Sequence, residues 1–205
     1  MNIFFMGTPE FAVPTLDILN KKYNVIGIFT QPPRPSGRGM KEIKSLIQQY
    51  SEKNKLNFYT PNNLKNDETL RLLKSLNPDL IVVVAYGLLI PEVILKIPSY
   101  GCINGHASLL PKWRGAAPIQ RAIEAGDIKT GCTSMLMEKG LDTGPMIHKK
   151  EILIKMENDV IDLFKSLSLL TAECLHETIQ KLISGDAKQI SQNNLEASYA
   201  HKLTK

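Results

Sequence analysis

Short apolar runs alternate with amphipathic segments along the first half of the chain. Residues 2–6 and 80–85 are apolar at almost every position, which is typical of strands buried on both faces. An amphipathic segment and a second apolar run at 25–29 follow the first of them. A strand, a helix and a strand within so few residues predict a βαβ unit, with a right-handed crossover and a parallel sheet.

The remaining pattern extends this unit into a larger α/β fold. Residues 159–183 repeat apolar positions with the 3.6-residue period of a helix, and Gly185 closes that helix. We also expect helices at about 42–53, 67–76 and 118–125, and strands at about 56–59, 101–103, 130–137 and 146–154. The predicted fold class is Rossmann-like α/β, doubly wound, with a mostly parallel mixed sheet and helices on both faces. Residues 1–185 would form a single domain, and the polar residues 186–205 would be a linker.

Composition narrows the choice of function only slightly. Hydrophobic residues make up 43% of the 205 positions and charged residues 22%, as in ordinary soluble proteins. The net charge of +5 favours an anionic partner weakly. Three widely spaced cysteines without a Cys-x-x-Cys pair indicate neither a disulfide framework nor a zinc site, and the histidines lack metal-ligand spacing. The cysteine and histidine spacing therefore predicts a protein without a bound metal. No membrane-length apolar run is present, and we expect a cytoplasmic protein.

Candidate chemistry is concentrated where predicted strands open into loops. Asn104 and His106 alternate along a strand end and so share one face, which suits either a catalytic site or a polar strand end satisfied by local turns. Asp142 lies on a turn between two glycines. The apolar loop 86–91 follows the buried strand 80–85, where α/β sheets hold ligands. It could clamp a flat aromatic ligand or simply plug the sheet edge.

A cationic segment follows the second predicted strand. Residues 30–40 contain three prolines and two glycines, which exclude a helix or an interior strand and predict a long exposed loop. Arg34, Arg38 and Lys41 make this loop positive. A long loop at the carboxyl end of a strand is usually functional, and the alternative is a solvated linker. The first turn, Gly-Thr-Pro at 7–9, lacks the dinucleotide-binding glycine pattern, so no nucleotide cofactor is indicated.

Five motifs together resemble the methionyl-tRNA formyltransferase family, within the broader group of formyltetrahydrofolate-dependent formyltransferases and hydrolases. They are FMGTPEFAVPTL at 5–16, TQPPRPSGRG at 30–39, NPDLIVVVAYG at 77–87, HASLLPKWRGAAPIQRAI at 106–123 and EKGLDTGPM at 138–146. They occur in the family's order and span most of the chain. The resemblance implies transfer of a formyl group from 10-formyltetrahydrofolate to the α-amine of methionyl initiator tRNA, by a monomeric enzyme that needs no metal.

The resemblance also implies roles for individual residues. Asn104 and His106 would donate hydrogen bonds to the oxyanion formed from the formyl carbonyl, and Asp142 would accept protons and hold His106. Arg38 would contact a phosphate or a base of the tRNA, while Arg34 and Lys41 would act mainly as charge. The residues expected at the folate are Tyr86, Gly87, Leu88, Leu89, Ile90, Ser108, Leu109, Leu110, Pro111, Gly140 and Leu141.

The chain departs from the family pattern in two places. Gly105 stands where the family usually has a β-branched residue, so we expect activity with looser positioning of Asn104 and His106. Family members continue into a C-terminal β-barrel domain that helps to bind tRNA, whereas this chain stops where the linker would begin, and we expect weaker tRNA binding. Three other functions stay open: formylation of a small amine such as an amino sugar, hydrolysis of 10-formyltetrahydrofolate, and folate or RNA binding without catalysis.

Overall fold

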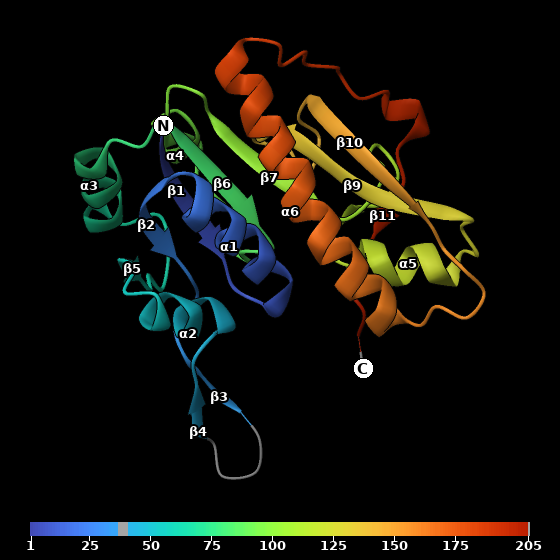
Figure 1. Cartoon of the computed structure of the whole chain (residues 1–205), viewed down its shortest axis with the longest axis horizontal. Helices are drawn as coiled ribbons and strands as arrows, with labels where there is room; N and C mark the ends of the chain where they lie inside the picture. Colours follow the sequence, from blue (N-terminus) through green and yellow to red (C-terminus); the bar gives the residue numbers. More distant parts are fainter. Residues whose placement is uncertain (37–40, 205) are drawn as a thin grey trace. The chain divides into compact units, whose positions relative to one another are not determined.

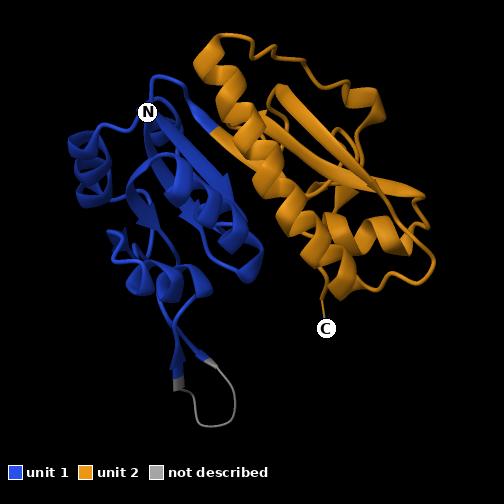
Figure 2. Ribbon diagram, in the orientation of Figure 1, with its two compact units in different colours: residues 1–102 blue, residues 103–205 orange. Residues whose placement is uncertain are grey.

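The computed structural model describes residues 1–36 and 41–204 (Figure 1). The chain forms two compact units, residues 1–102 and 103–205 (Figure 2). Strand pairing is parallel in the first unit's main sheet and antiparallel in the second unit's. The predicted α/β class with a mixed, mostly parallel sheet is therefore confirmed. Among the described residues, no helix is long and apolar enough to cross a membrane.

The first unit is built around one buried apolar strand, β1 (Asn2–Gly7). It pairs in parallel with β2 (Asn24–Phe29) on one side and β6 (Leu80–Val84) on the other, which confirms the predicted βαβ unit. All five residues of β6 are buried, as its unbroken apolar sequence requires. The other elements are a 3₁₀ turn (Glu10–Ala12), α1 (Val13–Lys22), α2 (Leu46–Lys53), β5 (Phe58–Tyr59), α3 (Asp67–Leu76) and α4 (Glu92–Leu95).

The cationic segment is not a loop throughout, and this part of the sequence prediction was wrong. β3 (Arg34–Ser36) and β4 (Lys41–Ile43) pair antiparallel, with Arg34 opposite Ile43. Each strand has only three residues, and Pro35 lies within the first of them. A two-stranded ribbon has no third strand that needs a backbone donor from the proline, so the proline is tolerated there.

The second unit contains an antiparallel sheet with a long helix against it. β9 (Lys129–Leu136) pairs with β7 (Cys102–His106) and with β10 (Met146–Leu153). The helix α6 (Val160–Ser184) begins at a capping box formed by Asp159 and Asp162 and ends at Gly185, whose φ is 81°. The other elements are β8 (Arg114–Gly115), α5 (Pro118–Glu124), a 3₁₀ turn (Asn194–Glu196) and β11 (Tyr199–Ala200).

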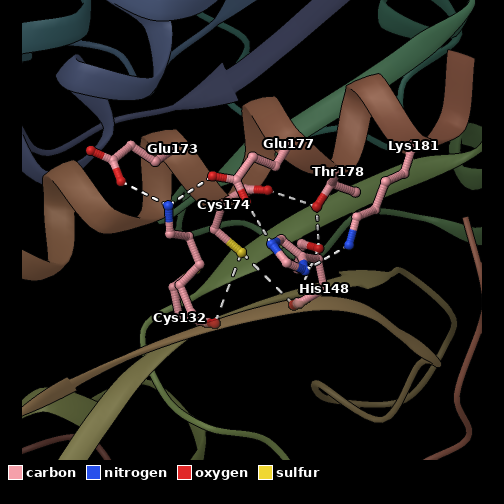
Figure 3. Close-up of polar contacts among 9 residues, drawn as sticks. Cys132, His148, Glu173, Cys174, Glu177, Thr178 and Lys181 are labelled. Carbon is pink, nitrogen blue, oxygen red and sulfur yellow. Dashed lines mark hydrogen bonds and ion pairs between the residues drawn. The ribbon is translucent and has the colours of Figure 1, made fainter.

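Polar side chains join α6 to the sheet beneath it (Figure 3). Lys150 of β10 contacts Glu173 at 2.9 Å and Glu177 at 2.8 Å. His148 Nε2 lies 2.7 Å from Glu177, and Lys181 donates to His148 Nδ1 at 3.0 Å. This network fixes the position of the helix along β10, while the apolar face of the helix packs against β9.

The C-terminal segment packs onto the second unit. β11 pairs in parallel with β8, so Ala200 lies beside Gly115. A Cβ at Gly115 would lie 2.9 Å from the Ala200 carbonyl oxygen, and the residue's φ is 113°, so both space and backbone favour glycine. Ile190 exchanges two backbone hydrogen bonds of 2.8 Å with Met146. The division predicted between residues 185 and 186 stays a prediction.

Candidate active site

The second unit brings His106 and Asp142 together. His106 ends β7, and its Nδ1 lies 3.6 Å from Asp142 Oδ2, with side chains only 7% and 14% exposed. Its other nitrogen, Nε2, lies 2.7 Å from the carbonyl oxygen of Trp113. A carbonyl can only accept, so Nε2 carries a proton. The 3.6 Å separation is longer than a hydrogen bond, which leaves Nδ1 available to a substrate atom.

A backbone amide holds the carboxylate oxygen of Asp142 that lies nearest His106. Gly115 N donates to Asp142 Oδ2 at 2.8 Å. Asp142 itself has a φ of 52°, a left-handed conformation that aspartate adopts more readily than most residues with a Cβ but that is still uncommon. Backbone strain of this kind persists only where the surroundings hold it in place. The turn is therefore shaped to aim this carboxylate at His106.

Asn104 lies two residues before His106, on the same face of β7. It is half-buried and opposes Met135 of β9. Within the described part of the chain, its amide makes no side-chain hydrogen bond, and it is not among the buried polar groups left without a partner. Its donors and acceptor therefore remain free for a ligand.

Gly105 faces the other way, toward α6. A Cβ built there would lie 2.6 Å from Thr171 Cγ2 and 2.8 Å from Leu175 Cδ1. Both helix residues are fully buried, so neither has space to retreat. Looser positioning at Gly105 stays a prediction, but the structure supplies a separate reason for the glycine, which is the close approach of α6.

In the first unit, the predicted ligand loop is pinned at Tyr86. Its carbonyl oxygen accepts hydrogen bonds from Thr8 Oγ1 and Gln31 Nε2, each at 2.9 Å. The ring is 2% exposed, and burial raises the pKa of the Tyr86 hydroxyl. Leu89 is 79% exposed, Leu88 is half-buried and Ile90 is 7% exposed, so Leu89 is the most exposed of these three apolar side chains. Of the predicted residues 86–90, Leu89 has the exposure that apolar ligand contact requires.

The predicted folate residues of the second unit differ in exposure. Ser108 and Leu110 are fully buried: the Ser108 hydroxyl donates to Lys112 O at 2.6 Å, and Leu110 packs with Met135 and Met146. These two side chains therefore shape the loop rather than face a ligand. Leu109 is half-buried, while Gly140 and Leu141 are exposed, Leu141 to 59%.

Of the three predicted tRNA-binding cations, the structure describes the contacts of Arg34. Arg34 is exposed, and its guanidinium donates to Gln31 Oε1. Arg38 lies outside the described residues. Lys41 begins β4, and its side chain is not described.

Sequence reasoning missed three groups that build the site: the Trp113 carbonyl, the Gly115 amide and the Gln192 side chain. The first two are backbone atoms inside the WRG part of a recognised motif, so the motif located them without revealing their use. Gln192 donates from Nε2 to the carbonyl oxygens of Asp142 and Gly144, each at 2.8 Å. It lies in a polar segment without periodicity, and nothing in the sequence pattern distinguishes it.

Chemically, these groups combine a proton acceptor with hydrogen-bond donors. Asp142 and His106 Nδ1 can take and pass a proton, and the Asn104 amide can donate to an oxygen that becomes negative. That combination suits attack of a nucleophile on an acyl carbon. Among residues 1–36 and 41–204, no group of three or more His, Cys, Asp or Glu side chains is placed to hold a metal ion.

Residues 1–179 match the sequence model of the formyl transferase family, and the chain belongs to that family. Methionyl-tRNA formyltransferase of Marinobacter nauticus is 46% identical over 206 residues, covering 100% of this chain and 66% of the relative. That of Alkaliphilus metalliredigens is 47% identical with the same two coverages. The chain thus spans 66% of the length of these curated relatives.

Solved structures of formyltransferases share the fold. Phosphoribosylglycinamide formyltransferase from Bacillus halodurans aligns with a TM-score of 0.74 at 20% identity, covering 90% of this chain and 96% of that one. An N-formyltransferase from Helicobacter canadensis, solved with folinic acid and dTDP-3-aminofucose, gives a TM-score of 0.75 at 19% identity, covering 98% and 74%. At these identities the likeness concerns the fold alone, and it agrees with the predicted Rossmann-like class.

Proposed function

We propose that this chain transfers the formyl group of 10-formyltetrahydrofolate to the α-amine of methionyl initiator tRNA. The observation that carries the proposal is the pairing of His106 Nδ1 with Asp142 Oδ2 at 3.6 Å, two residues along β7 from a free Asn104 amide. The relatives named methionyl-tRNA formyltransferase, at 46% and 47% identity, support this acceptor.

The proposed reaction uses each of the three side chains at a defined atom. The amine nitrogen forms a bond to the formyl carbon, and the carbonyl oxygen takes the negative charge. The Asn104 amide donates to that oxygen, and His106 donates to it from Nδ1 when the ring carries a second proton, because Nε2–H is already held by the Trp113 carbonyl. Asp142 accepts the proton that the amine loses. As the carbon–nitrogen bond to the folate breaks, Asp142 gives the proton taken from the amine to the folate nitrogen.

Different observations support the folate and the tRNA as substrates. Exposed Leu141, next to Asp142 in the sequence, offers apolar surface for a flat ring, and the folinic acid bound by the Helicobacter canadensis protein supports a folate co-substrate. The segment containing Arg34, Arg38 and Lys41 supplies positive charge for tRNA phosphates. A cytoplasmic location and a monomeric state stay predictions.

The test is a formylation assay with 10-formyltetrahydrofolate and charged initiator tRNA, with a nucleotide-linked amino sugar and an acceptor-free reaction run beside it. We expect formylmethionyl-tRNA as the product. Preferential formylation of the sugar would favour the small-amine function, and formate release without an acceptor would favour a hydrolase.

Two variants test the assigned residues. Asp142→Asn and His106→Ala should each lower kcat by about 10²–10⁴-fold, because each removes a proton-transfer group. Asp186→Asn is the matched control, since Asp186 is an exposed carboxylate in the same unit. Parental turnover in both active-site variants would point to a catalytically silent folate- or RNA-binding domain.

A further inference from the structure

The Gln192 side chain joins a buried cation to the turn that carries Asp142. Its Oε1 accepts from Arg114 Nε at 3.0 Å. Its Nε2 donates to Asp142 O and Gly144 O, each at 2.8 Å. Both hydrogens of one amide nitrogen are therefore used on the same turn, on either side of Thr143.

The surroundings allow this amide only one orientation. Exchanging its oxygen and nitrogen would place an acceptor against two carbonyl oxygens and an NH₂ group against a guanidinium, so all three hydrogen bonds would be lost. Arg114 is always charged, and it therefore keeps the Gln192 oxygen turned toward itself. The donors of Gln192 then point at the Asp142 turn.

Arg114 is itself fixed from the same C-terminal segment. It is 2% exposed, and its Nη2 donates to Asn194 Oδ1 at 3.0 Å. Its backbone N donates to Ser198 O at 2.8 Å, within the β8–β11 pairing. The next amide along, Gly115 N, is the donor to Asp142 Oδ2. Residues 192–198 thus hold the Asp142 turn through Gln192, and hold the carboxylate through Gly115.

We propose that Gln192 is a positioning residue that holds the Asp142 carboxylate against His106. The inference rests on the proposed function for its catalytic consequence. Asp142 adopts a left-handed backbone with a φ of 52°, which an unrestrained turn would leave. Gln192 anchors the carbonyl of Asp142 itself and that of Gly144 two residues on, and without those bonds the carboxylate swings away from the Nδ1 atom 3.6 Å distant.

Three variants separate positioning from simple stabilisation. Gln192→Ala removes all the bonds of the side chain, whereas Gln192→Glu keeps an acceptor for Arg114 and loses the two donors. Gln189→Ala is the matched control, an exposed glutamine of the same segment with no side-chain hydrogen bond to another described residue. Under single-turnover conditions we expect about a tenfold loss of rate in both Gln192 variants and a parental rate in the control.

The Asp142→Asn background shows whether Gln192 acts through Asp142. If it does, adding Gln192→Ala there changes the rate by less than about twofold, because the carboxylate being positioned is already gone. A purely structural role would lower the melting temperature and multiply the loss equally in both backgrounds. An equal loss in both backgrounds would overturn the inference. So would a parental rate in Gln192→Ala, or a parental rate restored in Gln192→Glu.

Amide hydrogen exchange supplies a readout that is independent of activity. The Gly115 amide is bonded to Asp142 Oδ2, so its exchange should be about tenfold faster in Gln192→Ala, relative to amides within β9. Unchanged Gly115 exchange contradicts the positioning role, whatever the parent catalyses. If the parent transfers no formyl group but Gly115 exchange accelerates, the proposed function fails and the positioning of Asp142 stands.

Discussion

Replacing Gly105 with valine tests how closely the catalytic strand lies against α6. The first added carbon would meet Thr171 Cγ2 at 2.6 Å and Leu175 Cδ1 at 2.8 Å, well inside normal contact distance. Overpacking of a buried site costs about 1–3 kcal/mol, and the stiffer unfolded chain returns about 0.4–1 kcal/mol. A net loss of about 1–2 kcal/mol lowers Tm by roughly 2–8 °C for a chain of this size.

The strand can relieve the clash only by moving away from the helix, and Asn104 and His106 flank the substituted position. A displacement of about 1 Å at such residues can cost about 100-fold in rate, so kcat should fall as well as Tm. Thermal melts and formylation assays measure the two effects. The matched variant is Gly105→Val with Thr171→Ala, which removes the nearest methyl and a buried hydroxyl that has no partner in the described structure.

This double variant should recover part of both losses, whereas Thr171→Ala alone should change little. If Gly105→Val melts and turns over like the parent, the packing explanation for the glycine is wrong. The same result would contradict the expectation of looser geometry at this position, because that expectation predicts that valine changes both the rate and the stability.

Three further predictions concern other parts of the molecule. Thr133→Val removes the hydroxyl that accepts from Leu110 N at 3.0 Å; an unpaired buried amide costs about 1–3 kcal/mol, measurable by urea denaturation. The hydrogen bond from Lys150 lowers the pKa of Glu177 in the folded state. The ionised Glu177 side chain therefore stabilises the protein at pH values above 4.5, its ordinary pKa. Glu177→Gln should therefore cost up to about 1 kcal/mol at pH 7, and melts should converge with the parent as pH falls through the folded pKa; a constant difference contradicts this. Burial raises the pKa of Cys102 to about 12, so iodoacetamide should label it far more slowly in the native than in the unfolded protein, as followed by mass spectrometry.

Much of the fold could be predicted because its strands are buried and its helices are delimited by strong signals. The bounds of α3, Asp67–Leu76, agree with the sequence pattern, since Asn66 caps its start and Asn77 adopts a left-handed conformation before Pro78. The ribbon of β3 and β4 and the parallel pair of β8 and β11 were missed. Strands of two or three residues have no period to detect, and β8 also depends on a distant segment, β11, for its partner.

The site shows the same division between local and distant information. Asn104, His106 and Asp142 could be proposed from residue type, from alternation along a strand and from a family resemblance. The groups that hold them could not, because Trp113 and Gly115 act through backbone atoms. Gln192 acts across a long stretch of chain and belongs to a segment expected to be a linker. Which side chains face a ligand was likewise invisible in the sequence, as the buried Ser108 and Leu110 illustrate.

The contact of the C-terminal segment with β8 has a consequence during protein synthesis. Trp113 N donates to Ser198 Oγ, a partner 85 residues further along the chain. A ribosome must translate that whole interval before the Trp113 and Arg114 backbones acquire these partners, so His106 and Asp142 exist for some seconds in a nascent chain without their supports. The active site would therefore be the last part of the second unit to mature, and an incompletely synthesised chain would not be a working enzyme.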